Sequence, residues 1–351
     1  MNARRGIITF LIASFLYGSA GASKRKITVS IPQMANSYVF LARYYGDRIY
    51  IVDTLRIDKK GKAKIKKELP GGIYVIALPS KTNFAEFVLN EKFVDLTIGD
   101  TSNMQASITT KKSRENIYYF EYLRTIREIG SKIDEYEKNL KDTSLHPSLD
   151  TSYIKGELKN LYSRMAEYKE NFIKEHPDLF VSYLLKISRP PEIPDSIKND
   201  TMKAYQYYKN SYLNGINFDD ERLIYTPVFI SVINNYLDKV VIQDPDTVAR
   251  EVISILDKAH ENSNMFQFLI GKLTYKYETS PYMGMEKVFV EIVNRYFATG
   301  TVDWIDTTKL REIVDRAKSM EPTLIGKKAP RLILADSSGN WHDLYSVNAD
   351  Y

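Results

Sequence analysis

Cysteine is absent from this sequence of 351 residues. Its absence excludes a disulfide, a thiolate nucleophile, a cysteine-ligated zinc site and a C-x-x-C redox pair within these residues. Histidine is scarce, and no histidine stands at metal-ligand spacing from another: the four are His146, His176, His260 and His342. The sequence therefore predicts no catalytic residue, no metal ligand and no cofactor-binding residue.

Phosphate-binding and hydrolase motifs are absent as well. The sequence contains no G-x-G-x-x-G, no P-loop and no G-x-S-x-G. Ser144, His146 and Asp150 have the residue types of a catalytic triad, but they fall within one predicted loop. No pair of carboxylates stands out from the helix surfaces, so no glycosidase dyad is predicted. Gly71 and Gly72 follow Pro70 and indicate a turn.

Long apolar runs are missing after the first residues of the chain. Arg4 and Arg5 precede the apolar run 6–17, and Ala20-Gly21-Ala22 fits a cleavage site. The run has about a dozen residues, fewer than the roughly 20 that span a bilayer. We predict a signal peptide over residues 1–22, cleavage near Ala22, export to the periplasm and no membrane span after cleavage.

The charge is nearly balanced. The chain has 49 Lys and Arg against 44 Asp and Glu, and without Arg4 and Arg5 the net charge is 47 − 44 = +3. The lysine runs 59–60 and 62–67 are interpreted as solvent-exposed strand and turn residues. We therefore predict no nucleic-acid partner.

Residues 23–110 have the pattern of short β-strands. Ile27, Val29 and Ile31 alternate with polar residues, and Asp58 to Gly61 and Pro70 to Gly72 mark turns. Further apolar runs cover 73–78, 84–89 and 93–98, and the last two are predicted to form a hairpin. The spacing predicts an antiparallel β-sandwich or partly open barrel.

Residues 111–320 have helical periodicity. Apolar positions at three- and four-residue steps predict a long antiparallel helical hairpin from 119–140 and 154–172, joined by 142–150. Asp178 is a candidate N-cap for a helix over 179–187, and Asp244 and Asp306 mark further helix starts. Later helices are expected at 196–213, 226–241, 245–261, 265–278, 285–297 and 307–319. Trp304 and the segment 282–285 are interpreted as helix-packing residues.

Residues 321–351 become extended again and carry a recognisable pattern. Ile325-Gly326, Ala329-Pro330, Asp336 and Gly339 resemble the opening of thioredoxin-like thiol-disulfide reductases and alkyl-hydroperoxide-reductase-type domains. The helical region, at 219–227, 283–290 and 300–304, resembles an uncharacterised domain that precedes such a domain in Bacteroidota proteins. The β region, at 52–58 and 69–74, is similar to the small β domain of the same exported proteins.

This resemblance implies a fold class and a function. The fold is α+β and multidomain: β-sandwich (23–110), helical domain (111–320), and the first strands of an incomplete thioredoxin-like domain (321–351). The function implied is that of a non-catalytic accessory portion of a periplasmic thiol-disulfide oxidoreductase. No cysteine matches the catalytic pair of that family, so no catalytic residue carries over. We also expect a protein partner or self-association through the helical region.

Two alternatives stay open. The first is a free-standing periplasmic or surface interaction module, because the helical hairpin is able to pack on a partner helix. The second is a hydrolase of an unrecognised class, which no group of residues in the sequence supports.

The terminal segment also carries a structural prediction. Residues 322–351 are too few to bury their own apolar face, which consists of Leu332, Leu334 and Leu344. We therefore expect this segment to be mobile or docked onto the helices.

Overall fold

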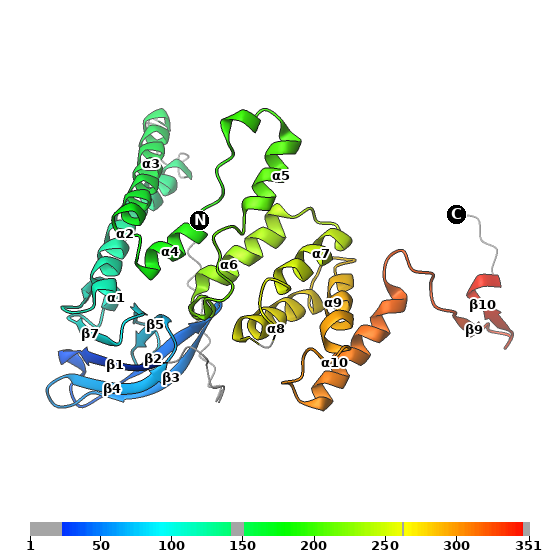
Figure 1. Cartoon of the computed structure of the whole chain (residues 1–351), viewed down its shortest axis with the longest axis horizontal. Coiled ribbons are helices and arrows are strands. Elements are labelled where there is room, and N and C mark those ends of the chain that lie inside the picture. The colour runs from blue at the N-terminus through cyan, green and yellow to red at the C-terminus, as the bar shows by residue number, and fades with distance from the viewer. Residues whose placement is uncertain (1–22, 142–150, 262, 347–351) are drawn as a thin grey trace. The chain divides into compact units, whose positions relative to one another are not determined.

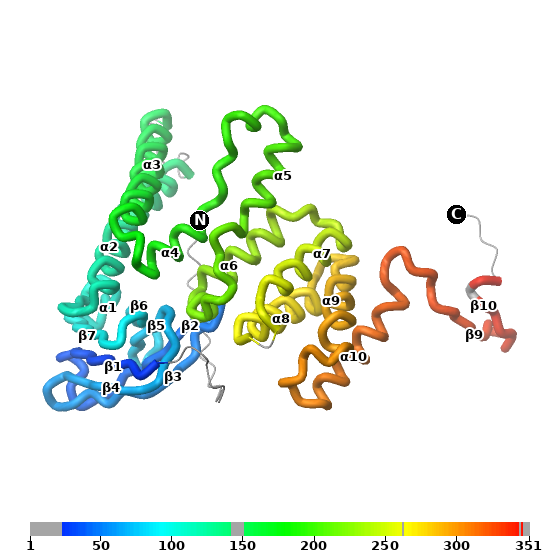
Figure 2. Tube along the Cα trace, viewed as in Figure 1, coloured from blue at the N-terminus to red at the C-terminus, as the bar shows by residue number. Residues whose placement is uncertain are grey.

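The computed structural model of the chain describes residues 23–141, 151–261 and 263–346 (Figures 1 and 2). Its contacts divide the chain into two compact units, the first ending at Tyr236 and the second beginning at Leu237. The predicted α+β class is confirmed, because a β-rich region comes first and a helical region follows. None of the described helices is both long and apolar enough to cross a bilayer.

Two four-stranded sheets form the β-rich region. One has the order β3-β2-β5-β6, all antiparallel, with β2 (Tyr38–Tyr45), β3 (Arg48–Arg56), β5 (Gly72–Ala77) and β6 (Phe84–Leu89). The other has the order β4-β1-β7-β8, with β1 (Ser23–Ser30), β4 (Lys62–Leu69), β7 (Phe93–Ile98) and β8 (Ile108–Thr109). The short helices η1 (Pro32–Met34) and α1 (Met104–Ser107) lie in the connections.

Alternation of apolar and polar residues sets the two faces of the second sheet. Ile27 and Val29 of β1 and Val94 of β7 are fully buried, while the residues between them are polar or half-exposed. Strand β5 is instead buried at all six positions. Its second face is covered because the short helix η3 (Glu221–Tyr225) packs on β5 and β2.

The predicted hairpin between 84–89 and 93–98 is wrong. β6 pairs with β5, whereas β7 crosses to the other sheet and runs parallel to β1, an exception to the antiparallel expectation. The chain changes sheets at residues 90–92, where the Lys26 N–H donates to the Lys92 carbonyl at 2.9 Å. Local spacing favoured a tight turn between β6 and β7, but β6 pairs with the strand before it and β7 pairs with β1, which is remote in the sequence.

The predicted helical hairpin is present as α2 (Arg114–Lys141) and α3 (Thr151–Glu175). Its outer part is held by an apolar cluster that includes Ile133 and Leu158. Nearer the sheets the packing is aromatic: the Tyr122 ring lies 5.2 Å from Phe172 and stacks on Tyr168 at 6.1 Å between centroids. The joining residues 142–150 lie outside the described residues.

The remaining helices follow the predicted positions closely. In the first unit they are α4 (Phe180–Ile187), η2 (Asp195–Ile197), α5 (Thr201–Ser211) and α6 (Pro227–Asn235). The π-helical turn η4 (Tyr236–Val240) follows α6 and contains the boundary between the units. In the second unit they are α7 (Pro245–Leu256), α8 (Asn264–Glu278), α9 (Glu286–Ile292), the π-helical turn η5 (Val293–Phe297), α10 (Thr307–Met320) and η6 (Glu321–Thr323).

Two predicted helix starts and one packing residue are confirmed. The Asp244 side chain accepts from the Thr247 N–H, and Asp306 accepts from the N–H groups of Thr308 and Lys309. Trp304 packs edge-on against Phe266, with ring centroids 6.0 Å apart. For the segment 282–285 before α9, the packing interpretation is confirmed at Met285, which is 6% exposed, and wrong at Met283, which is 87% exposed.

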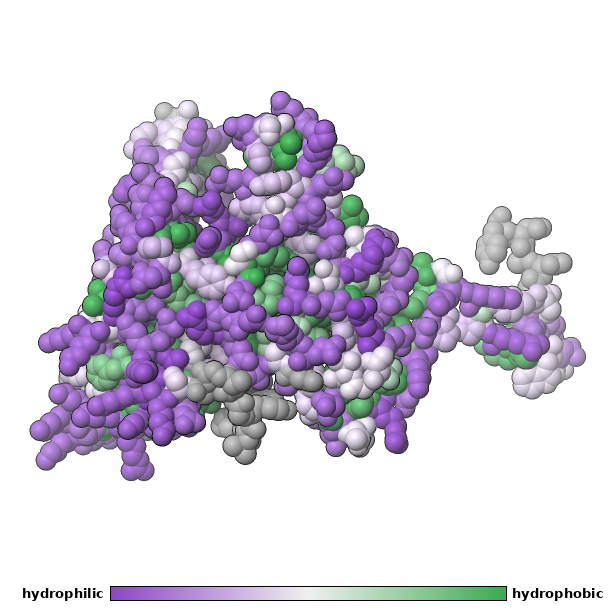
Figure 3. Space-filling view, in the orientation of Figure 1, coloured by the Kyte–Doolittle hydropathy of each residue, from purple (hydrophilic) through white to green (hydrophobic). Residues whose placement is uncertain are grey.

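The last described residues form a small hairpin of β9 (Ile333–Ala335) and β10 (Trp341–Asp343), followed by η7 (Leu344–Ser346). Its turn is closed by Asp336, whose carboxylate accepts from the Ser338 and Asn340 N–H groups. Leu334 is 59% and Trp341 74% exposed, and Figure 3 shows hydrophobic side chains at the surface of this hairpin. As predicted, the segment does not bury its own apolar side chains; the Leu344 side chain lies outside the described residues.

Gly72 provides a test of how β5 meets η3. Its φ is +149°, and a Cβ there would lie 2.5 Å from Cβ of Tyr225. We expect Gly72→Ala to lower the free energy of unfolding by at least about 1–3 kcal/mol, since strain and a clash with fixed atoms combine. Urea unfolding measures it. Gly99→Ala is the control, because its Cβ meets nothing within 4 Å; equal effects of the two changes would contradict this account.

Candidate functional site

The histidines weighed in the sequence lie in separate packing and turn contacts where the structure describes them. Among the described residues, no group of three or more His, Asp or Glu side chains is placed to hold a metal ion. His176 packs between aromatic rings, 3.8 Å from Tyr118 and 5.1 Å from Phe172. His342 contacts the Asp336 carboxylate at 2.9 Å. Ser144, His146 and Asp150 lie outside the described residues.

The first turn of α2 carries a connected polar structure. Arg114, Glu115 and Asn116 are consecutive, and each side chain reaches a different element. Arg114 forms an ion pair with Asp178. Glu115 and Asn116 are buried, with exposures of 2% and 0%. We call this turn and its partners the α2 junction.

Asn116 covers the open edge of β6. Its Oδ1 accepts from the Val88 N–H at 2.7 Å, and its Nδ2 donates to the Val88 carbonyl at 2.7 Å. Gln105 of α1 binds the Glu86 backbone in the same way. Its Oε1 accepts from the Glu86 N–H at 2.6 Å, and its Nε2 donates to the Glu86 carbonyl at 3.4 Å. Two side-chain amides thus hydrogen-bond the outward-facing N–H and C=O groups of β6 at alternate residues. A further strand would otherwise be able to pair with these groups.

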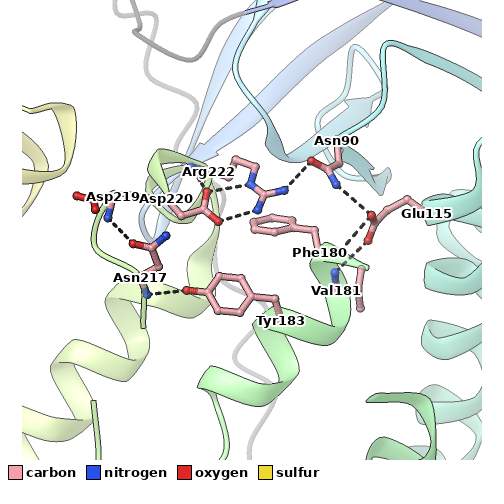
Figure 4. A network of polar contacts seen from close by, with 9 residues as sticks. All are labelled: Asn90, Glu115, Phe180, Val181, Tyr183, Asn217, Asp219, Asp220 and Arg222. Atoms are coloured by element: carbon pink, nitrogen blue, oxygen red, sulfur yellow. Dashed lines mark hydrogen bonds and ion pairs between the residues drawn. The ribbon is translucent and has the colours of Figure 1, made fainter. Parts of the chain in front are cut away.

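Glu115 caps the helix α4 from a distance (Figure 4). Its carboxylate accepts from the N–H groups of Phe180 and Val181 at 3.2 and 3.0 Å. These donors belong to the first turn of α4, which has no intrahelical acceptor for them. The predicted cap, Asp178, is therefore wrong, because its carboxylate pairs with Arg114 instead.

A second arm of the junction runs through Asn90 to Arg222. Asn90 donates to Glu115 at 3.2 Å and accepts from the Arg222 guanidinium at 2.8 Å. Arg222 also forms a two-pronged pair with Asp220, at 2.8 and 2.7 Å, and lies 4.4 Å over the Phe180 ring. Figure 4 shows these residues converging from the sheet connection, α2, α4 and η3. One continuous polar network therefore joins four elements of the first unit.

Tyr183 extends the network along α4. Its hydroxyl accepts from the Asn217 N–H at 2.8 Å, and the Asn217 side chain accepts from the Asp219 N–H at 3.0 Å (Figure 4). The loop that leads into η3 is thus tied to the same helix that Glu115 caps.

Burial determines the electrostatics of Glu115. Burial raises the pKa of the Glu115 carboxyl, against the opposing effect of the hydrogen bonds from Val181, Phe180 and Asn90. The pKa of Arg222 is raised in turn, chiefly by its hydrogen bonds to Asp220. The hydrogen bonds of these groups join one part of the protein to another. The arrangement therefore positions elements of the first unit.

A surface hollow of about 410 Å³ lies beside the junction, lined by residues of β6, α1 and α2 that include Glu86, Gln105 and Arg127. Glu86 accepts hydrogen bonds from the hydroxyls of Tyr44 and Tyr119. Burial raises the pKa of Glu86 and outweighs these two hydrogen bonds. The hollow combines a half-buried carboxyl with an exposed guanidinium.

Sequence reasoning missed the junction, although one signal was present. Asn116 stands three residues before Tyr119, so it continues the apolar stripe of α2 with a polar side chain. A polar residue on the buried side of a helix needs a partner. Its partner, Val88, is remote in the sequence, and spacing alone does not identify it.

Two family models match the chain, and both are described as domains of unknown function. One, DUF4369, covers residues 25–117, and the other, DUF5106, covers 154–319. The α2 junction links the two matched regions, with Asn90 and Glu115 in the first and Phe180 and Arg222 in the second. No curated protein matches the chain.

One solved structure is similar over part of the chain. It is described as a thioredoxin-like protein from Bacteroides caccae ATCC 43185, at 21% identity and a TM-score of 0.36. The similarity covers 46% of this chain and 58% of that one, so the chain matches only part of the length of that protein.

The cap of α4 is testable by removing its acceptor. We expect Glu115→Ala to lower the free energy of unfolding by about 2 kcal/mol or more, since each buried N–H left without an acceptor costs about 1–3 kcal/mol. Urea unfolding followed by circular dichroism measures the loss. Glu121→Ala, at an exposed position of the same helix, is the control. A loss no larger than that of the control would refute the cap.

Glu86 provides a pH test. Because its folded pKa is raised above the ordinary 4.5, its contribution to stability is full below that pH and is lost as pH rises through the raised value. The unfolding free energy of wild type minus that of Glu86→Gln, taken with its sign, should therefore fall as pH rises from 4.5, because glutamine does not titrate. Glu121→Gln controls for the loss of an exposed carboxylate. A difference that grows with pH would contradict the prediction.

Proposed function

We propose that this chain is the non-catalytic accessory and binding portion of an exported, periplasmic thiol-disulfide oxidoreductase of the thioredoxin-like type. The single observation that carries the proposal is the terminal hairpin. β9 and β10 form around the Asp336–Gly339 turn of the family-like segment, yet Leu332, Ile333 and Leu334 are 49%, 44% and 59% exposed. A two-stranded hairpin is marginal in water and needs further strands or a helix to cover it.

The composition of the chain separates the redox step from the binding role. Thiol–disulfide exchange requires attack by a cysteine thiolate, and this sequence has no cysteine. Under this proposal the redox step takes place in a cysteine-bearing thioredoxin-like domain outside these residues, and this portion supplies surface and geometry. The α2 junction serves that role, because it fixes the α2–α3 hairpin and α4 on the edge of the sheet.

The reading frame beyond Tyr351 is the direct test. We expect it to encode a C-x-x-C within about fifty codons, soon after the first central strand of a thioredoxin-like domain. The residues 1–351 alone should give no insulin reduction with dithiothreitol above background, and the extended protein should give it. A frame that holds no such cysteine pair would refute the proposal.

The hairpin supplies an independent structural test. In residues 1–351 alone, amides of β9 and β10 should exchange with solvent at least about 100-fold faster than those of β5, since little covers them. In the extended protein they should become protected. Hydrogen exchange read by mass spectrometry measures both. Protection equal to that of β5 in the short form would contradict this role.

Export is part of the proposal and has its own test. The basic residues Arg4 and Arg5, the apolar run and Ala20-Gly21-Ala22 support it. Expressed with residues 1–22 in a bacterium with a periplasm, the protein should be recovered from the periplasmic fraction with Ser23 as its first residue. N-terminal sequencing decides this. An uncleaved cytoplasmic product would count against export.

A second candidate is a free-standing interaction module, and the surface of α3 favours it. Tyr153 and Tyr162 are 60% and 49% exposed on the helical hairpin, and exposed tyrosine is enriched at interfaces. Sedimentation should then show a dimer that dissociates in Tyr153→Arg. A monomer in both proteins would count against self-association through α3.

A further inference from the structure

One face of the sheet β4-β1-β7-β8 is occupied by lysines from separate parts of the sequence. In β1, Lys24 and Lys26 point to this face, and in β4 every second residue does; the lysines there are Lys62, Lys64 and Lys66. Lys112, just after β8, joins them across the Phe93 ring. All six lysines are exposed. We call this surface the lysine face.

The lysines form a row across the strands. Lys26 is paired directly with Lys66 on one side and with Phe93 on the other. The Nζ atoms of Lys26 and Lys112 lie 5.6 and 5.8 Å from the Phe93 ring centre. The order across the sheet is therefore Lys66, Lys26, Phe93, Lys112. Like charges directly opposite each other on neighbouring strands are unfavourable, so nothing in sheet pairing accounts for the row.

The face has little compensating negative charge. Its two carboxylates are Glu68 and Asp95, which gives 6 − 2 = +4. The Asp95 carboxylate is already engaged by the Lys111 and Lys112 N–H groups and the Thr110 hydroxyl. None of the six lysines forms an ion pair with the described residues. Residues 23–351 carry a net charge of 47 − 44 = +3, so the net charge of this face exceeds that of residues 23–351 as a whole.

The composition and shape of the face select among anionic partners. It presents lysine and no arginine, and lysine acts as a point charge where arginine forms a two-pronged contact with a specific phosphate. It is the outer side of a sheet, and the surface hollow described above lies elsewhere, beside β6 and α2. A diffuse, extended negative surface fits such an arrangement, and anionic phospholipid headgroups provide one, at about 1 kcal/mol per lysine near the surface.

We propose that the lysine face docks this protein on an anionic phospholipid surface, without insertion into the bilayer. The interaction is electrostatic, and Phe93 lies at its centre as a half-buried residue that keeps two lysine stems apart. Docking brings β1 and β4 against the headgroups and relieves the repulsion between Lys26 and Lys66. Because the charges are exposed, salt weakens the interaction.

The test is vesicle co-sedimentation of the chain from Ser23, where β1 begins, so that the apolar run 6–17 does not contribute. Vesicles contain phosphatidylcholine with about one third phosphatidylglycerol, or phosphatidylcholine alone. The variant Lys26→Gln/Lys64→Gln/Lys66→Gln removes three charges from the face. The control Lys155→Gln/Lys159→Gln/Lys174→Gln removes three charges from exposed positions of α3. Thermal unfolding checks that both variants remain folded.

We expect the wild-type protein to bind the anionic vesicles only. The lysine-face variant should partition to them roughly 100-fold more weakly, and the α3 control should partition nearly as wild type does. Equal binding by wild type and the lysine-face variant would overturn the proposal. So would an equal loss in the α3 control. Lysine-face-dependent binding to duplex DNA or polyglutamate, without binding to the vesicles, would overturn it in favour of a soluble polyanion.

Discussion

The first turn of α2 holds the first unit together through three neighbouring side chains. Asn116 satisfies the edge of β6, Glu115 satisfies the start of α4, and Arg114 holds Asp178 in the turn before α4. Because these residues are consecutive on one helix, the sheet edge and α4 are placed with respect to the same rigid turn. The α2–α3 hairpin then projects in a direction that the sheet determines.

The network uses buried polar groups where apolar packing would give similar stability. Replacing a buried charge pair by apolar residues is often neutral, whereas removing one partner is costly. Unlike apolar packing, the polar network fixes the orientation of the elements that it joins. Glu115 accepts from two specific N–H groups, and Asn116 matches one donor and one acceptor of Val88. The edge of β6 is thereby closed to other strands. The lysine face lies on the other sheet, so the binding surface and the structural junction are separate.

The sequence predicted what depends on local pattern. The helices were found because apolar residues recur at helical spacing, and Asp244 and Asp306 act as caps because the donors lie two or three residues away. Asp178 had the same local signal, and the prediction failed because Glu115, remote in the sequence, took the donors. The hairpin 84–98 failed for a related reason: β7 pairs with β1 rather than with its neighbour. The lysine face also depends on register, which brings Lys26 opposite Lys66.

Hydrogen exchange at three amides tests the central claim most directly. The N–H groups of Val88, Phe180 and Val181 all donate to side chains of the α2 turn, Val88 to Asn116 and the other two to Glu115. If that turn holds the sheet edge and α4 as one body, the three amides open together and exchange at the same slow rate. Exchange of Phe180 and Val181 that is tenfold or more faster than that of Val88, about 1.4 kcal/mol, would show that α4 opens independently of the sheet.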